Sequence, residues 1–243
     1  MITKYDTDLT KQSFIIIIVR MKLLSDGKIL DVISFSGGVL FVEMVTLESG
    51  EARLAYRCFD FSLGNFTPIT MGVYLLNKFG PAYEPISDRL NNSVLCDATV
   101  LPDMRVIVLA PDGSCAIFSK DGDLSWSGQF SYHDNYVRSP FTNGEYFWCT
   151  VPDENSIVQY DATSLKTHIR IGNSDSSAFT SPVTLSIYDD VVYVCNSSIG
   201  KIKTVSLPSY AVGDYKSFEE PIYKYFQIAE NEVVWLKSGL YIL

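Results

Sequence analysis

Short apolar runs separated by turn residues recur along the chain and predict paired β-strands. The clearest example is residues 146–160, YFWCTVPDENSIVQY, in which two runs rich in β-branched and aromatic residues flank the turn sequence PDEN. β-Branched and aromatic residues favour strands, whereas Pro, Asp and Asn favour turns. The same hairpin pattern is repeated in residues 105–118, 191–205 and 232–243, with a looser copy in residues 39–59. The pattern therefore predicts an all-β protein built from hairpins.

The spacing of these hairpins predicts the architecture. The midpoints of their first strands lie 65, 41, 45 and 41 residues apart, at Val42, Ile107, Trp148, Tyr193 and Val234. A repeat of about 40–50 residues made only of strands is typical of a β-propeller, whose blades are four-stranded sheets packed radially around a channel. We therefore predict a β-propeller of five four-stranded blades, with six as the alternative, in a single domain spanning residues 1–243.

Proline positions support this repeat, and the 65-residue interval between the first two hairpins requires an insertion. Ser139-Pro140, Ser181-Pro182 and Glu220-Pro221 each stand just before the first strand of a blade, where Pro is tolerated because that residue need not donate to the ladder. A hidden blade would need about 80 residues for two repeats, so the longer first step indicates an insertion. We expect the fourth strand of the first blade within residues 66–79 and a long loop at residues 81–92.

The last blade has only three strands before the chain ends, so its outer strand must come from elsewhere. Without one, residues 240–243 would present an unpaired apolar edge, which invites aggregation. The run FIIIIV at residues 14–19 is the strongest β-former in the chain and has no partner in its own neighbourhood. We therefore expect residues 14–19 to pair with residues 240–243 and so to close the ring.

Composition and charge exclude several classes of function. The chain has 47% hydrophobic residues, enough for a large core, and a formal net charge of −9 at pH 7. An acidic chain without basic clusters is not expected to bind nucleic acid or anionic membranes. The longest apolar run is far shorter than the ~20 residues of a transmembrane helix, and no export signal is expected.

Reactive groups are sparse. Five cysteines are present, at positions 58, 96, 115, 149 and 195, with no CxxC pair. We expect them to be small buried hydrophobic residues, and their odd number favours the cytoplasm. The chain lacks the GxSxG, GxxxxGK and GxGxxG motifs, and His133 and His168 are too few for a three-histidine metal site. Asp121-Gly122-Asp123 resembles part of a calcium loop but lacks the further ligands, so we expect a hairpin turn there and no cofactor, with Ca²⁺ as the alternative.

Residues 77–118, NKFGPAYEPISDRLNNSVLCDATVLPDMRVIVLAPDGSCAIF, resemble NHL-like and TolB-like six-bladed β-propeller proteins of the Bacteroidetes. Those proteins carry a KGxGPGE-like turn, an inner strand and a hairpin with an Asp-Gly turn; here the turn reads KFGPAYE. Residues 146–172 match the family's pattern of strand, turn and Tyr-Asp before an outer strand. The resemblance covers residues 29–243, although only five blades are counted. It implies a propeller, a cell-envelope or periplasmic location and no established chemistry.

The candidate site is the mouth of the channel, because the loops that enter the innermost strands of a propeller converge there. The residues that precede those strands are mostly polar or charged: Asp97, Arg138, Ser139, Thr180, Glu219 and Glu220, with Arg89 and Glu84 added if residues 81–92 fold inward. We expect Asp97, Arg138 and Glu220 to lie at one end of the channel. The alternative is that these charges only pair with each other.

These residues favour a non-enzymatic binding module whose channel-mouth face takes a protein, peptide or glycan ligand. The alternative is a metal-dependent propeller hydrolase or lactonase with a divalent cation in the channel. Such an enzyme needs three or four Asp, Glu, Asn or His side chains aimed at one point. The chain offers Asp97, Glu219 and Glu220 and no histidine there, so the sequence assigns no catalytic residue and no metal ligand.

Overall fold

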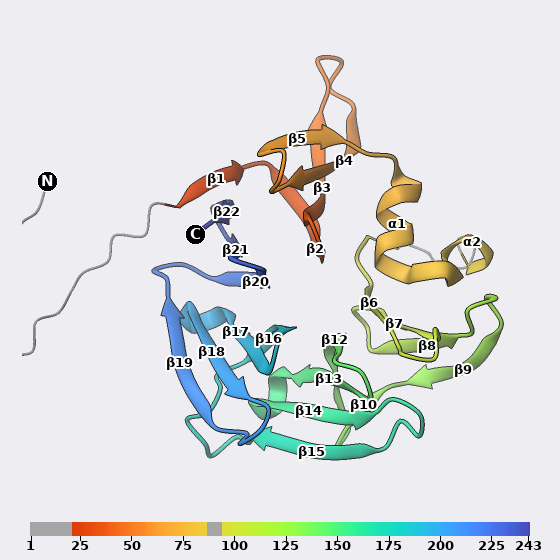
Figure 1. The fold of residues 1–243 in the computed structure, drawn as a ribbon, viewed down its shortest axis with the longest axis vertical. Coiled ribbons are helices and arrows are strands. Elements are labelled where there is room, and N and C mark those ends of the chain that lie inside the picture. Colours follow the sequence, from red (N-terminus) through yellow and green to blue (C-terminus); the bar gives the residue numbers. More distant parts are fainter. Residues whose placement is uncertain (1–20, 87–93) are drawn as a thin grey trace, which may run out of the picture.

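The computed structural model describes residues 21–86 and 94–243, which form five four-stranded antiparallel sheets around a central channel (Figure 1). This confirms the predicted all-β propeller and its five blades. We name the blades A to E, and each strand list runs from the channel outward.

Blade A contains β2 (Lys28–Phe35), β3 (Gly38–Thr46), β4 (Ala52–Asp60) and β5 (Asn65–Pro68). Blade B contains β6 (Asp97–Val100), β7 (Val106–Leu109), β8 (Ser114–Phe118) and β9 (Leu124–Gln129). Blade C contains β12 (Arg138–Thr142), β13 (Tyr146–Val151), β14 (Ser156–Asp161) and β15 (Thr167–Gly172). Blade D contains β16 (Pro182–Tyr188), β17 (Val191–Asn196), β18 (Lys201–Ser206) and β19 (Val212–Ser217). Blade E contains β20 (Ile222–Ile228), β21 (Asn231–Leu236), β22 (Gly239–Ile242) and β1 (Lys22–Ser25).

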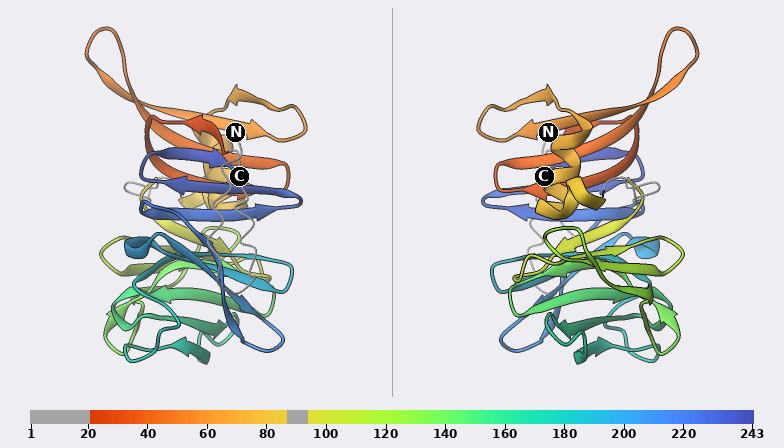
Figure 2. Two further views of the ribbon diagram at one scale, coloured as in Figure 1. Left: turned by 90° about the vertical axis from the view of Figure 1, so that its left-hand side faces the viewer. Right: turned by 90° about the vertical axis from the view of Figure 1, so that its right-hand side faces the viewer.

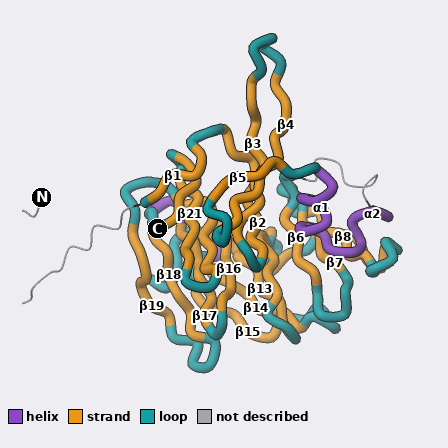
Figure 3. Tube along the Cα trace, turned by 45° about the horizontal axis from the view of Figure 1, so that its top comes forward, coloured by secondary structure: helices purple, strands orange, loops and turns teal. Residues whose placement is uncertain are grey.

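Short elements connect the blades and their strands. They are the hairpin of β10 (Ser131–Tyr132) and β11 (Asn135–Tyr136) and the 3₁₀ turns η3 (Pro152–Glu154) and η4 (Ser197–Ile199). The β3–β4 hairpin is paired along its whole length and projects beyond the other blades (Figures 2 and 3). Pro140 lies inside β12 and not before it, at a bulge where its missing N–H costs no ladder bond. No helix in the described ranges is long and apolar enough to cross a membrane.

Apolar cores lie between successive blades. The β13 and β14 hairpin that the sequence pattern marks most clearly is buried on both faces, because blade C is enclosed by blades B and D. Trp148 is fully buried among Phe179 and Leu185 of the next repeat. The five cysteines are buried free thiols, and burial raises the pKa of Cys115 and Cys195 to about 12. A thiol with such a pKa stays protonated and packs as a small hydrophobe, as predicted.

The insertion between blades A and B is helical, so the strand expected in residues 66–79 is wrong beyond Pro68, and the loop expected at residues 81–92 is wrong over residues 81–86. β5 ends at Pro68, and α1 (Met71–Phe79), η1 (Gly80–Ala82) and α2 (Tyr83–Ile86) follow; residues 87–92 lie outside the described part. Thr70 caps α1, since its Oγ1 accepts the Val73 N–H at 3.3 Å, and Gly80 ends it with a φ of 62°.

The helix α1 fills the sector between blades A and B (Figure 1). Its buried residues follow a helical period: Tyr74, Leu75, Lys78 and Phe79 share one face. The apolar members of this face join β3 residues of blade A and β7 residues of blade B in a single core. The 65-residue interval between the first two hairpins therefore contains a helical insertion and not a further blade. We call α1, which lies between blades A and B, the wedge.

The wedge gives a first prediction. Replacing Leu75, which is 5% exposed, with alanine should lower the free energy of unfolding by about 2–3 kcal/mol, because the substitution leaves a cavity between two blades. The matched control is Leu76→Ala on the same helix. Leu76 is 50% exposed, so its loss should cost less than about 0.5 kcal/mol. Urea denaturation of both variants measures the two losses. A loss for Leu75→Ala as small as that for Leu76→Ala would show that packing of α1 does not stabilise the ring.

The ring is closed by a strand from the N-terminal part of the chain, as predicted. β1 pairs antiparallel with β22, with Lys22 opposite Ile242 and Leu23 opposite Tyr241. Leu24 is buried in a core shared by blades A and E. The strand that pairs with β22 is thus residues 22–25 and not residues 14–19, which we expected there and which themselves lie outside the described residues.

Candidate functional site

Bulges mark the start of the innermost strands. Among the described strands, β2, β12, β16 and β20 each carry one extra residue near the first residue, whereas β6 keeps a regular register. A bulge bends a strand and re-aims the side chain that follows it. Regular pairing resumes at Asp31, Phe141, Thr184 and Lys224. Three of these four side chains are polar, although β2, β16 and β20, which carry them, are otherwise rich in apolar residues.

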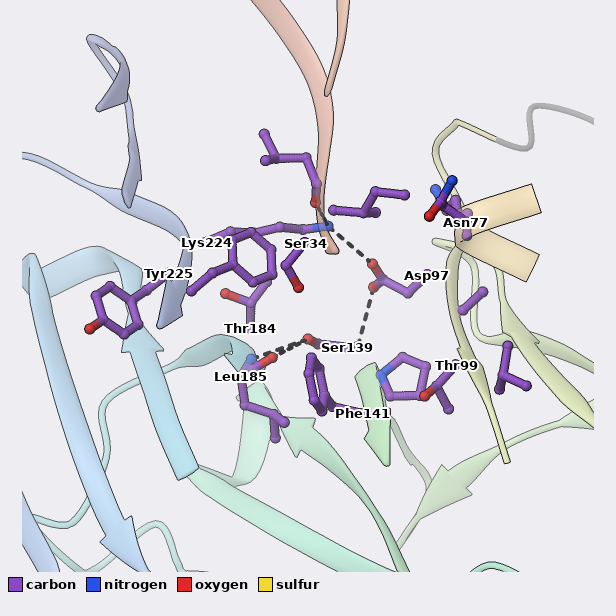
Figure 4. A pocket seen from close by; sticks show the side chains of 17 residues that line it. Ser34, Asn77, Asp97, Thr99, Ser139, Phe141, Thr184, Leu185, Lys224 and Tyr225 are labelled. Atoms are coloured by element: carbon purple, nitrogen blue, oxygen red, sulfur yellow. Dashed lines mark hydrogen bonds and ion pairs between the residues drawn. The ribbon is translucent and has the colours of Figure 1, made fainter. Parts of the chain in front are cut away.

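A cavity of about 220 Å³ lies in the channel beside these bulges (Figure 4). Residues of all five innermost strands and of α1 line it. Its polar side chains come from all five blades and from the helix: Ser34, Asn77, Lys78, Asp97, Thr99, Ser139, Thr184, Lys224 and Tyr225. Phe141 and Leu185 supply apolar surface. The cavity is thus a joint product of the whole ring.

Asp31 is the centre of a buried charge cluster beside this cavity. Its Oδ1 accepts hydrogen bonds from Lys224 Nζ at 2.6 Å and from the Val32 N–H at 2.8 Å. Its Oδ2 accepts from Lys78 Nζ and from the Tyr74 hydroxyl, both at 2.5 Å. Asp31 belongs to blade A, Lys224 to blade E, and the other two side chains to α1. The cluster therefore joins the first blade, the last blade and the wedge.

Burial and ion pairing have opposite effects on Asp31. Burial alone would raise the pKa of its carboxyl, but Lys224 and Lys78 lower that pKa to about 2. Burial likewise works against the charged form of Lys224, yet the carboxylates of Asp31 and Asp97 raise the pKa of this lysine. Burial and the Asp31 charge raise the pKa of Tyr74, so its hydroxyl remains a donor. Asp31, Lys224 and Tyr74 therefore hold the protonation states that their hydrogen bonds require.

Asp97 lies at the edge of this cluster and faces the cavity (Figure 4). Its Oδ1 is 4.0 Å from Lys224 Nζ, and its Oδ2 accepts the Ser139 backbone N–H at 3.2 Å. The Asp97 side chain is 35% exposed, against 6% for Asp31. Ser139, whose N–H makes this contact, adopts a left-handed backbone with a φ of 51°.

Polar contacts continue around the channel from blade to blade. Ser139 Oγ of blade C accepts the Leu185 N–H of blade D at 3.1 Å, and Thr150 Oγ1 of blade C donates to the Val183 carbonyl of blade D at 3.3 Å. Thr184 of blade D donates to the Tyr223 carbonyl of blade E at 2.6 Å. Lys224 of blade E then reaches blade A through the Val32 carbonyl at 3.1 Å. Much of the polarity at this end therefore holds neighbouring blades together.

The residues predicted for the site are only partly brought together. Asp97 and Ser139 contact each other and line the cavity. Arg138 begins β12 and Glu220 precedes β20, so both belong to the end where the innermost strands start, but neither lines the cavity.

The remaining predicted residues lie apart from the cavity. The Glu220 carboxylate binds the Ser238 N–H at 2.7 Å and its hydroxyl at 2.6 Å. The Thr180 N–H donates to Asn196 Oδ1 at 2.7 Å, Glu219 is exposed, and Arg89 lies outside the described residues. Asp97, Glu219 and Glu220, considered for a metal, therefore do not converge. Within residues 21–86 and 94–243, no group of three or more His, Cys, Asp or Glu could hold a metal ion.

Sequence reasoning missed Asp31, Lys78 and Lys224. A usable signal exists for two of them, since KILDVISF and IYKYFQI each place one charge inside an apolar strand. A charge in such a position is rarely buried without a partner. Lys78 gives no such signal once residues 66–79 are read as a strand, because only the helical period places it beside Tyr74.

Comparisons with known proteins show the fold alone. No protein-family model matches the chain, and no curated protein matches its sequence. "Crystal structure of RRP9 WD40 repeats" matches with a TM-score of 0.50 and 9% identity over 88% of this chain and 59% of that one. "Structure of U3-55K" matches with a TM-score of 0.50 and 10% identity over 88% of this chain and 60% of that one.

The chain spans about three-fifths of the length of these two structures. A protein of unknown function from Bacteroides caccae is similar at a TM-score of 0.42 and 13% identity, over 74% of this chain and 78% of that one, which is too low to carry an argument. The chain is a five-bladed β-propeller with WD40-like structural neighbours.

Proposed function

We propose that the chain is a non-enzymatic binding module whose channel-mouth face takes a segment of a protein or peptide partner. The observation that carries the proposal is the cavity of about 220 Å³ lined by every innermost strand and by α1. Ligands of propellers and other ring folds bind where side chains from several repeats converge. A cavity of this size admits a side chain or a short polar group, so the partner would insert a segment into the channel.

Two resemblances support this class of function. The structures of the RRP9 WD40 repeats and of U3-55K share the fold of this chain, and WD40 domains are built from the same radial repeats. The NHL-like and TolB-like pattern of residues 77–118 points to the same architecture, and we keep this finer kinship as part of the proposal. A glycan in place of a peptide is an outcome of the test below.

A block of the channel mouth tests the proposal. Binders selected from a random-peptide library and from a glycan array are titrated by calorimetry against the wild type and Asn77→Trp. Asn77 is exposed and lines the cavity, so a tryptophan there should weaken binding at least tenfold. The matched control is Leu63→Trp, because Leu63 is 64% exposed in the β4–β5 turn, away from the cavity. Affinity for this control should equal that of the wild type.

Three results would decide between the possibilities. Peptides that lose affinity only with Asn77→Trp support the proposal. Glycans that do so, without any such peptide, reject the protein partner but keep the site. Binders that respond equally to both tryptophan variants, or an absence of binders in both screens, reject the channel as the binding site.

A further inference from the structure

The charged groups of the cavity differ in how far their bonding capacity is used. Lys78 Nζ donates to Asp31 and to the Val94 carbonyl, and Lys224 Nζ donates to Asp31 and to the Val32 carbonyl. Within the described part of the chain, the third N–H of the Lys224 ammonium has Asp97 as its nearest remaining carboxylate, at 4.0 Å. Both ammonium groups are thus already paired with the Asp31 carboxylate.

The cavity instead offers hydrogen-bond acceptors. Among the described residues, one direct hydrogen bond reaches Asp97, from the Ser139 N–H, whereas an ionised carboxylate can accept about four. The Asn77 side-chain amide donates to the Val73 carbonyl at 2.8 Å, and no described residue donates to its Oδ1. Both residues line the cavity from neighbouring elements, β6 and α1 (Figure 4). A ligand group that suits them is rich in donors.

We infer that the partner segment inserts a basic side chain, lysine or arginine, whose cation binds Asp97; this inference rests on the proposed function. Asp97 is the most exposed charge of the cavity, at 35% against 17% for Lys224, so an entering ligand meets its carboxylate first. An anionic group would have to lie against that carboxylate. The Phe141 side chain lines the same cavity and suits the apolar stem of a long basic side chain.

Long-range electrostatics act in the same direction. The chain has a formal net charge of −9, which attracts basic segments and repels acidic ones. The pair of Asp97 and Lys224, at 4.0 Å, is longer than the pair of Asp31 and Lys224 at 2.6 Å. A guanidinium or ammonium can therefore bind Asp97 without breaking the buried cluster.

The test uses short capped peptides of the form Gly-X-Gly, with X as arginine, lysine, citrulline or glutamate, added to the ¹⁵N-labelled full chain. Citrulline keeps the shape of arginine without its charge. We expect shifts at cavity residues with arginine or lysine, at least tenfold tighter binding than with citrulline, and weakening as salt rises. Asp97→Asn should weaken binding about tenfold or more, while it keeps an oxygen for the Ser139 N–H. Asp214→Asn removes the same charge at a 74% exposed position and should leave the affinity unchanged.

The outcomes separate this inference from the proposed function. The inference of a basic side chain is overturned if the arginine and citrulline peptides bind equally well. It is also overturned if Asp97→Asn and Asp214→Asn weaken binding equally. If neutral or acidic ligands bind and Asn77→Trp blocks them, the proposed binding module is kept and the basic side chain is rejected. If no ligand responds to Asn77→Trp, both are rejected. A thermal melt of Asp97→Asn that matches the wild type confirms that any loss of binding is not a loss of folding.

Discussion

Replacing Asp31 with asparagine is expected to lower the free energy of unfolding by about 3–5 kcal/mol, because it leaves two buried ammonium groups without their carboxylate. The Lys78 and Lys224 side chains are 3% and 17% exposed, so water replaces little of the lost interaction. The substitution keeps the shape of the side chain and therefore isolates the charge. Urea denaturation followed by tryptophan fluorescence measures the loss.

Two matched variants show whether the charge cluster is the cause. Adding Lys78→Met to Asp31→Asn should recover part of the stability, since the more deeply buried of the two unpaired ammonium groups is then removed. Asp214→Asn breaks the pair with Lys203 at a 74% exposed carboxylate and should cost less than about 1 kcal/mol. A loss for Asp31→Asn as small as that of Asp214→Asn would contradict the role of the cluster.

The pH dependence of unfolding gives a second readout of the same variant. The pKa of Asp31 is lowered from 3.8 to about 2 in the fold, so the unfolded chain binds the proton more readily. The contribution of Asp31 is therefore fully present above about pH 4 and is lost as the pH falls towards 2. At 1.36 kcal/mol per pKa unit, it amounts to about 2 kcal/mol. Asp31→Asn should lack this part of the acid destabilisation.

The repeat could be predicted from the sequence because each hairpin carries its own local signal. Residues 146–160 combine strand-forming runs with a turn, and the structure gives β13, η3 and β14 at the same place. The helix α1 was missed because its nine residues, MGVYLLNKF, are as apolar as a buried strand. A short apolar run does not distinguish the helical period from the strand period. The buried face of α1 can be recognised only when the two blades that cover it are in place.

Only those site residues that stand at the start of an innermost strand could be predicted from the sequence. Asp97 and Ser139 were found because they stand at the start of innermost strands, which meet around the channel. Asp31 and Lys224 meet beside the same channel for a different reason, namely the bulges in β2 and β20. The extra residue of a bulge changes which side chains of the strand point inward. The sequence pattern does not predict the position of that extra residue. Partners more than 190 residues apart in the chain were therefore not paired in advance.

The ring closure gives the second large effect, and two deletions separate its parts. Deleting residues 2–26 removes β1, exposes the edge of β22 and uncovers the core around Leu24 and Leu240, which are 8% and 0% exposed. Burial of one leucine contributes about 1.5–3 kcal/mol, and the uncovered neighbours add to this loss. We expect the melting temperature to fall by about 10 °C or more, or the protein to aggregate through the open edge.

The control deletion removes residues 2–20 and keeps β1. Both edges of β22 are already occupied, one by β21 and one by β1, so the register from Lys22 to Ser25 does not require the residues before it. Closure joins distant parts of the chain, but its entropic cost grows only logarithmically with loop length, so a short strand with a buried leucine can hold the ring. The melting temperature of this deletion should stay within about 3 °C of the wild type in differential scanning calorimetry. A fall as large as that of the longer deletion would mean that closure depends on the run at residues 14–19, and that β1 alone does not complete blade E.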